Sequence, residues 1–377
     1  MQSEVIEITS CAYGGDGIGR LSDGRICFVP GVIPGEIAGV KTVVEKKRFC
    51  RGEVVEIFRK SDHRQDAPCP LYGHCPGCAY MHMDYACEVE IKSRQLRDFL
   101  VRGKVASPEV IKSPFASPSE LFYRNKLVLH HAGYVASDNR SIIPVKKCFL
   151  ADEKINDILG QAGGGETLFR KSSTQEAAQI ISPETPGIIR ENIDGAGNFS
   201  VAGNGFFQTN MAVAAELVRQ VKTAVKLSGC RHLLELYCGV GVFSIALAES
   251  FPELCCTGVE VNSQAIRFAK QNAAEHQVSD RCRFYAMDAL KALKRFRNHP
   301  DWAVLVDPPR GGMEKPALQK LLEVDARQII YISCAADTLV RDLQILVPAG
   351  YEVRSAQMLD MFPRTAHFEV LCVLQKR

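Results

Sequence analysis

The chain has 377 residues, of which 46% are hydrophobic and 24% are charged, and its formal net charge at pH 7 is +3. This composition is ordinary for a soluble globular protein, and the length predicts two or three domains. No apolar run approaches the roughly 18 residues that a membrane span needs, and the first residues lack a signal-peptide pattern, so we expect a cytoplasmic protein without a membrane partner.

Residues 1 to 58 have the pattern of a small β-barrel. Short alternating runs, such as Val5–Ile8 and Gly52–Ile57, are separated by Gly and Pro residues at barrel-like intervals. The segment Gly14–Gly19 predicts a glycine-rich turn, and because no helix follows it, we exclude a dinucleotide phosphate loop. Between residues 41 and 64, eight Lys or Arg residues outnumber four acids, which suits contacts with phosphates or an ordinary solvated surface.

The order of residues in this segment resembles the TRAM domain. The resemblance rests on residues 14–20, which read Gly-Gly-Asp-Gly-Ile-Gly-Arg, and on Phe28–Gly31 and Ile33–Glu36. TRAM domains resemble OB barrels and serve RNA-modifying enzymes as RNA-binding modules. The resemblance therefore implies an RNA partner.

A cluster of cysteines follows the barrel segment. The chain has fifteen cysteines, and without a secretion signal a disulfide framework is a poor explanation for them. Cys69, Cys75 and Cys78 lie close together in a turn-rich stretch, and Cys148 is our candidate for a fourth ligand of one metal centre. Thiolate ligands suit zinc or an iron–sulfur cluster, and the ligand type alone does not separate the two.

Residues 59 to 205 predict a small central α+β domain that contains this cluster. Residues 84 to 100 have helical spacing, and Phe122–Leu129 predicts a strand. The aromatic and basic start of that strand could contact RNA, or it could be an ordinary edge strand. We therefore expect three domains, over residues 1–58, 59–205 and 206–377.

From residue 206 the pattern changes to alternating strands and helices, which predicts an α/β Rossmann-like domain with a doubly wound parallel sheet. A helix is expected over residues 211–227. The expected strands are residues 232–237, 255–260, 282–288, 302–307 and 328–332, followed by a closing antiparallel pair at 351–361 and 367–374. Gly239 and Gly241, directly after the first strand, let the backbone pass close to a ligand at a helix N-terminus.

Three acids end successive strands of this sheet. Glu260 lies 21 residues after Gly239 and suits two ribose hydroxyls, and Asp288 could bind an adenine amino group. Each acid, including Asp307, could singly be a helix N-cap. Together they favour a nucleoside ligand, and S-adenosylmethionine fits best.

The fifth strand brings Cys334 to the edge of the sheet where ligands bind. We interpret Cys334 as a nucleophile whose pKa is lowered by the N-terminus of a helix over 337–346, although a cysteine near a strand is often only a small buried hydrophobe. Arg310 and Phe206 are candidates to hold a nucleotide, or are purely structural.

Nearly the whole chain resembles the RNA uracil-5-methyltransferases, which make 5-methyluridine in ribosomal and transfer RNA. Besides the TRAM segment and the cysteine cluster, the resemblance rests on Phe206–Asn210, Leu236–Gly241, Asp307–Arg310, Ser333-Cys334 and Phe362–Glu369. It implies that Cys334 is the nucleophile and Glu369 the base. With Gly239 from the glycine turn, the methyl-donor site that it implies consists of Gln208, Tyr237, Gly239, Glu260, Asp288 and Asp307. It also implies a [4Fe-4S] cluster, in preference to zinc, on Cys69, Cys75, Cys78 and Cys148.

The chain departs from the family pattern at two places. Ala335-Ala336 follow the nucleophile where the family usually has Asn-Pro, and Val242 replaces an asparagine found in many members. A looser turn after Cys334 is therefore expected.

The expected activity is methylation of carbon 5 of a uridine by a monomer, through a covalent bond between Cys334 and carbon 6. 23S ribosomal RNA is the favoured substrate, and transfer RNA is the alternative. Two rival hypotheses are another RNA base methyltransferase, since Asp-Pro-Pro also occurs in amino-group methyltransferases, and a non-catalytic RNA-binding or redox-sensing iron–sulfur protein.

Overall fold

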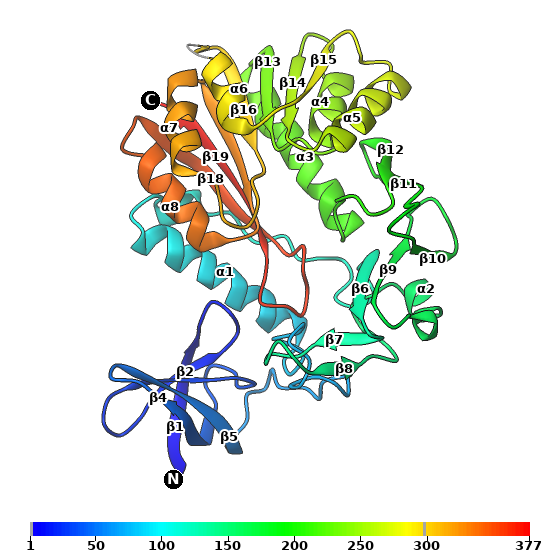
Figure 1. Cartoon of the computed structure of the whole chain (residues 1–377). Coiled ribbons are helices and arrows are strands. Elements are labelled where there is room, and N and C mark those ends of the chain that lie inside the picture. The colour runs from blue at the N-terminus through cyan, green and yellow to red at the C-terminus, as the bar shows by residue number, and fades with distance from the viewer. Residues whose placement is uncertain (1–2, 297–298) are drawn as a thin grey trace.

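The computed structural model describes residues 3–296 and 299–377, and Figure 1 shows a small barrel at one end and a large α/β sheet at the other. The barrel closes in the strand order β1-β2-β3-β5-β4. Its strands are β1 (Ser3–Cys11), β2 (Gly17–Arg20), β3 (Ile26–Val29), β4 (Ile37–Glu45) and β5 (Phe49–Arg59). The expected OB-like barrel is therefore present.

The expected turn over Gly14–Gly19 is wrong in its second half, because Gly17 and Gly19 belong to strand β2. A side chain on Gly17 would come within 2.4 Å of Val32, and one on Gly19 within 2.9 Å of the Glu7 carbonyl oxygen. These glycines are thus required by close packing inside the barrel and do not turn the chain.

Helix α1 (Tyr85–Arg102) follows the cysteine segment and lies beside the large sheet. It begins at Asp84, whose side chain accepts a hydrogen bond from the Cys87 amide. Its apolar residues Leu96 and Leu100 pack into the core formed by one face of that sheet. We expected this helix in the central domain, but it covers the carboxy-terminal sheet.

The central strands form two small groups. One is a five-stranded sheet in the order β10-β9-β6-β7-β8, and the other is a pair of antiparallel strands that packs on the large domain. The elements are β6 (Lys126–His130), β7 (Gly133–Val135), β8 (Ile142–Pro144), α2 (Glu153–Asn156), β9 (Glu166–Lys171), β10 (Ala178–Ile181), β11 (Ile188–Ile193) and β12 (Gly197–Ala202). Strand β6 begins later than expected, because Phe122 has a φ of +55°, which a strand cannot contain.

The large sheet has seven strands in the order β15-β14-β13-β16-β17-β19-β18. Six strands run in one direction, and β19 runs antiparallel to them between β17 and β18. The strands are β13 (His232–Leu236), β14 (Cys255–Glu260), β15 (Cys282–Ala286), β16 (Trp302–Val306), β17 (Gln328–Ser333), β18 (Tyr351–Leu359) and β19 (Glu369–Lys376). The predicted doubly wound sheet and its closing antiparallel pair are confirmed.

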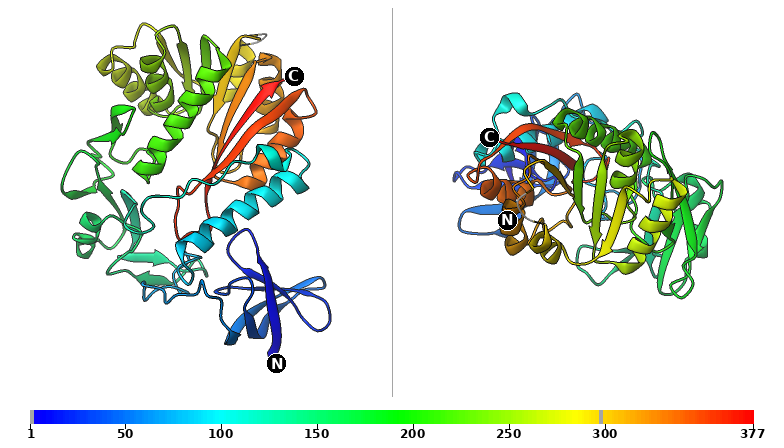
Figure 2. Two further views of the ribbon diagram at one scale, coloured as in Figure 1. Left: turned by 180° about the vertical axis from the view of Figure 1, so that it is seen from behind. Right: turned by 90° about the horizontal axis from the view of Figure 1, so that it is seen from above.

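Helices cover both faces of this sheet (Figure 2), so its central strands are apolar on both sides. Helices α3 (Met211–Ser228), α4 (Val242–Ser250) and α5 (Ser263–Glu275) lie on one face. Helices α6 (Ala289–Arg295), α7 (Lys315–Val324), α8 (Ala336–Leu346) and α1 lie on the other. Within the described part of the chain, no helix combines the length and the apolar character that crossing a membrane requires.

Candidate active site

The predicted site residues meet at the carboxyl edge of the parallel strands. Strand β13 pairs with both β14 and β16, so the chain winds outward from β13 in both directions, and in such sheets ligands bind at this edge. Tyr237, Glu260 and Asp307 directly follow or end these three strands, and Asp288 follows β15 by two residues. The topology therefore brings these four residues to one edge, as expected.

The glycine turn and Glu260 form one unit. The Glu260 carboxylate accepts hydrogen bonds from the amides of Asn262, at 2.9 Å, and Gly239, at 3.4 Å. Gly239 has a φ of +52°, and a side chain added to it would point into open space. The turn thus leaves a cradle beside a carboxylate, which fits the ribose of a nucleoside.

Asp288 has a structural role in addition to any binding role. Its carboxylate caps α6 by accepting hydrogen bonds from the amides of Leu290, at 2.9 Å, and Lys291, at 3.3 Å. The N-cap explanation is therefore correct for this acid. Burial raises the pKa of the neighbouring Tyr237 to about 12, and Asp288 and Glu260 add to that rise, so the three side chains share one electrostatic environment.

Cys334 lies in the tight turn between β17 and α8. Ser333 holds this turn, because its hydroxyl accepts a hydrogen bond from the Ala335 amide at 3.2 Å and donates one to the Ala335 carbonyl at 3.0 Å. The expected lowering of the thiol pKa is not found. Burial raises the pKa of Cys334 to about 11, the negative charges of Glu369 and Asp307 add to the rise, and Arg310 opposes it. Desolvation and two carboxylates therefore outweigh the helix N-terminus.

Two carboxyl groups raise the pKa of the thiol. Glu369 is the first residue of β19 and is buried, and its pKa is raised well above the usual value by burial and then by Asp307. Asp307 has a pKa raised to about 7 by its desolvation. The pairing of Ser333 with Val370 thus brings a thiol and a carboxyl that binds protons strongly together from separate strands.

The loop before Glu369 is anchored by a buried ion-pair network. Lys92 of α1 donates to Glu88, at 2.7 Å, and to Asp360, at 2.8 Å, and all three side chains are fully buried. The Arg364 amide also donates to Glu88, at 2.7 Å, and its carbonyl accepts from the amide of Ala79 at 2.8 Å. The network therefore joins the loop to α1 and to the cysteine segment.

Arg310 makes hydrogen bonds with two other segments of the chain, the loop before β19 and helix α8. Its guanidinium donates to Nδ1 of His367 at 3.2 Å, and its carbonyl accepts from the Thr338 hydroxyl at 3.2 Å. Burial and then the Arg310 charge lower the pKa of His367 to about 4, so this ring is neutral and can accept. Sequence reasoning named Arg310 but missed its partner, although His367 lies in the Phe362–Glu369 motif.

Gln208 and Phe206 lie in the loop before α3. The backbone carbonyl of Gln208 accepts from the side-chain amide of Asn125 at 3.0 Å, which fixes the loop next to the start of β6. Phe206 is 74% exposed, so it has no packing role in the core.

Glu235 is an acid that the sequence analysis overlooked. It lies in the apolar strand β13, is buried, and accepts hydrogen bonds from the amide of Ser244, at 2.9 Å, and from its hydroxyl. Burial raises its pKa to about 8. The sequence contained a signal for this residue, since Glu235 is an acid within an otherwise apolar strand.

The predicted metal ligands are close but do not form a metal site. Over residues 3–296 and 299–377, no group of three or more His, Cys, Asp or Glu residues is arranged to hold a metal ion. All fifteen cysteines are free thiols. Burial raises the pKa of Cys78 to about 12, and Cys148, Cys75 and Cys69 contribute to that rise, so the four thiols share one surrounding. The donor set suits a thiolate-bound cluster, and a metal is not shown.

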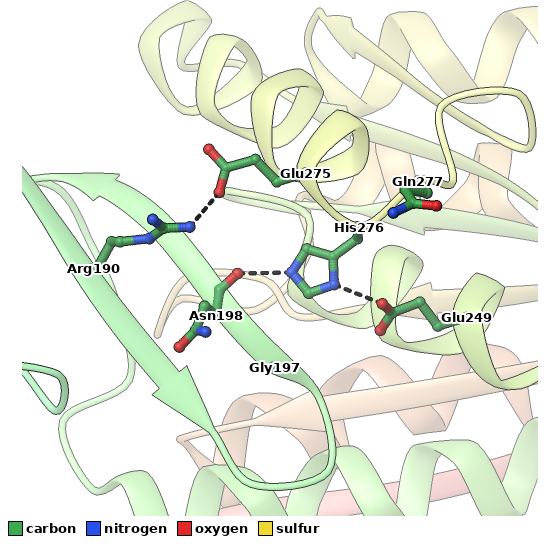
Figure 3. Close-up of a pocket in the computed structure, with 7 residues that line it drawn as sticks. All are labelled: Arg190, Gly197, Asn198, Glu249, Glu275, His276 and Gln277. Carbon is green, nitrogen blue, oxygen red and sulfur yellow. Dashed lines mark hydrogen bonds and ion pairs between the residues drawn. The ribbon is translucent and has the colours of Figure 1, made fainter.

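A separate hollow of about 330 Å³ lies between the β11–β12 pair and helices α4 and α5 (Figure 3). Arg190 pairs with Glu275 at 2.6 Å. His276 contacts Glu249 at 2.8 Å and the Asn198 carbonyl at 2.7 Å. None of the predicted site residues lines it, so it has no part in the site at the sheet edge.

Comparisons with known proteins agree with this geometry. Residues 193–377 match a family described as tRNA (Uracil-5-)-methyltransferase, and residues 4–55 match the TRAM domain. The chain is 28% identical to a protein of Gloeobacter violaceus described as an uncharacterized RNA methyltransferase, over 100% of this chain and 97% of that one. A protein of Aquifex aeolicus with the same description is 28% identical and matches over 98% of both chains.

One solved structure covers nearly the whole fold. It is the tRNA (uracil-54, C5)-methyltransferase of Pyrococcus abyssi in complex with S-adenosyl-L-homocysteine. The two chains superpose with a TM-score of 0.73 at 22% identity, over 98% of this chain and 99% of the other. The likeness supports the arrangement of barrel, central strands and large sheet.

Proposed function

Since the chain belongs to the RNA uracil-5-methyltransferase family, we propose that it methylates carbon 5 of a uridine through a covalent bond between Cys334 and carbon 6. The observation that carries the proposal is the register of β17 against β19, in which Ser333 pairs with Val370, so that Cys334 and Glu369 are the next residues along the two strands. The negative charges of Glu369 and Asp307 raise the pKa of Cys334, which agrees with this register. An amino-group methyltransferase has no use for a thiol beside a proton-accepting carboxyl.

The reaction follows from these groups. The Cys334 thiolate adds to carbon 6 of uracil, which turns carbon 5 into an enolate carbon that accepts a methyl group. S-adenosylmethionine supplies that methyl group from its sulfonium. Glu369 then takes the proton from carbon 5 and the thiolate leaves, so the products are 5-methyluridine, S-adenosylhomocysteine and a proton. The raised pKa of Glu369 makes its ionised form a stronger base than a carboxylate in water.

We propose that the methyl donor binds at the sheet edge beside the glycine turn. In this proposal Glu260 holds the ribose and the exposed Asp288 holds the adenine, and the open space beside the Cα atom of Gly239 supports it. Tyr237 and Gln208 complete the proposed lining. The uridine has to leave its base stack to reach Cys334, and the exposed ring of Phe206 is available to stack on a base during that movement.

The proposed substrate is 23S ribosomal RNA, with transfer RNA as the second substrate to test. The support is the barrel, which carries exposed Phe58 and Val55 next to the basic residues between 41 and 64. Transcripts of 23S ribosomal RNA and of transfer RNA are each treated with the enzyme and a labelled methyl donor. The substrate is the transcript in which labelled 5-methyluridine is found.

The test of the mechanism uses RNA that contains 5-fluorouridine. Fluorine at carbon 5 leaves no proton for Glu369 to remove, so the enzyme stays bound to the methylated base. We expect a covalent complex, seen as a shifted band under denaturing conditions, that requires the methyl donor and is lost in Cys334→Ala. The control is Cys255→Ala, which removes an exposed thiol at the start of β14. A complex that persists in Cys334→Ala contradicts the mechanism.

The four clustered cysteines are proposed to hold a [4Fe-4S] cluster with a structural role, because methyl transfer needs no electron. The support is that Cys148 lies in a core cluster against which Cys69 and Cys78 pack. Iron and sulfide analysis with visible absorption of anaerobically purified protein tests this. Zinc without iron in the purified protein counts against the cluster. An iron content in Cys75→Ser equal to that of the wild type counts against it as well.

A further inference from the structure

Tyr13 belongs to the barrel but lies against the catalytic loop. It follows β1 in the turn that leads to β2, and its ring packs edge-on against Phe99 of α1, with centroids 5.1 Å apart. It also packs edge-on against Phe368, at 5.8 Å, and Phe368 directly precedes the proposed base Glu369. The barrel therefore contributes one side chain to the wall of the site.

The turn that carries Tyr13 is fixed in place. Gln95 of α1 donates a hydrogen bond to the carbonyl of Ala12 at 2.9 Å. Gly15 has a φ of +103°, and a side chain there would lie 2.7 Å from the Cβ atom of Ala79. A glycine is thus required for the barrel turn to press against the segment that follows the cysteine cluster.

The Tyr13 hydroxyl is buried, and no residue that the structure describes accepts a hydrogen bond from it. The residues around Cys334 affect its pKa. Burial raises the pKa of Tyr13, the Ala336 amide and Arg310 oppose the rise, and Asp337 and Cys334 add to it. A buried hydroxyl that lacks an acceptor is unfavourable until something accepts from it.

We propose that Tyr13 is a substrate-binding residue, whose hydroxyl donates a hydrogen bond to an oxygen atom of the nucleotide held against Cys334. The two alanines after the nucleophile, Ala335 and Ala336, offer no polar side chain there, and Tyr13 supplies one from the barrel. The inference rests on the proposed function and adds that the barrel takes part in the catalytic pocket itself.

The test compares Tyr13→Phe with Tyr351→Phe. The first variant keeps the ring contacts and removes an unpaired hydroxyl, so its stability towards urea should equal or exceed that of the wild type. The second removes a buried hydroxyl that donates to the Ala326 carbonyl at 2.8 Å, far from the site, so it should lose stability and keep its kinetics.

The readout is the rate of covalent complex formation with 5-fluorouridine RNA at RNA concentrations below saturation. We expect Tyr13→Phe to react about tenfold more slowly, the effect of one lost hydrogen bond, while Tyr351→Phe reacts like the wild type. Equal rates for Tyr13→Phe and the wild type overturn the inference and leave the proposed function standing. No complex with the wild type overturns the proposed function and this inference with it.

Discussion

Replacing Lys92 by methionine should destabilise the protein strongly and in a pH-dependent way. The Lys92 ammonium is fully buried and contacts two carboxylates, Glu88 at 2.7 Å and Asp360 at 2.8 Å. Methionine fills a similar volume, but Glu88 is then left with Arg364 as its cation, and Asp360 is left with the hydrogen bond from the Tyr85 hydroxyl at 2.9 Å. One buried negative charge is then uncompensated.

The expected magnitude follows from this arrangement. Removing one partner of a buried pair costs about 3–5 kcal/mol, which is a third or more of the total stability of many domains. Glu88 already has a pKa raised to about 7 by burial, above its usual 4.5, so it stabilises the fold at low pH and loses that contribution as the pH rises through 7. Without Lys92 its pKa rises further. The deficit of Lys92→Met should therefore be larger at pH 8 than at pH 6.

Urea unfolding followed by the fluorescence of Trp302 measures this effect. Trp302 is the one tryptophan of the chain and starts β16, so it reports on the large sheet. The control is Arg94→Met on the same helix, which breaks an exposed pair with Glu90 and should cost less than about 1 kcal/mol. A loss below about 1 kcal/mol for Lys92→Met, or the same loss at pH 6 and pH 8, would refute the reasoning.

Two further predictions concern the carboxyls at the nucleophile. Asp307 has a folded pKa of about 7 against 3.8 in a model peptide, so its stabilising contribution is complete at low pH and is lost as the pH rises through 7. Asp307→Asn should therefore be inactive, but at pH 8 it should be more stable than the wild type by at most about 4 kcal/mol. Urea titrations should show this gain in stability vanishing towards pH 4. A gain that does not depend on pH would contradict the prediction. Glu369→Gln should add the methyl group but fail to remove the carbon 5 proton. A covalent complex with ordinary uridine RNA should therefore accumulate and be visible on denaturing gels. Product release at the wild-type rate would indicate that another residue is the base.

The local pattern of apolar and polar residues was sufficient to predict the large sheet and the edge at which its parallel strands end. Strands β13 to β17 are apolar runs that end in polar residues, and such runs carry their own signal in the sequence. The glycines of β2 led to a wrong prediction of a turn, because glycine is common in turns. Gly17 and Gly19 are instead required because a side chain there would clash with Val32 and Ile6 across the barrel. That requirement comes from packing between strands and is absent from the local pattern.

The meeting of the candidate residues at one sheet edge was predictable, but their electrostatics were not. The ends of the strands place Glu260 and Asp307 at that edge, because parallel strands share one carboxyl edge. The raised pKa of Cys334 depends on Glu369, which arrives from a distant antiparallel strand, and on burial by segments far away in sequence. Tyr13 could not be anticipated for the same reason, since its neighbours Phe99 and Phe368 come from opposite ends of the chain.

The position of β19 has a consequence for synthesis on the ribosome. It pairs with β17 through Ser333 and Val370 and with β18 through Leu359 and Glu369, so it closes the gap between two strands made before it. Until residues 369–376 emerge, both neighbouring strands have an unpaired edge that can associate with other chains. The nascent protein therefore passes through a vulnerable interval between the synthesis of β18 and that of β19. The same event that ends this interval delivers Glu369 to Cys334, so protection from aggregation and assembly of the proposed catalytic pair occur together.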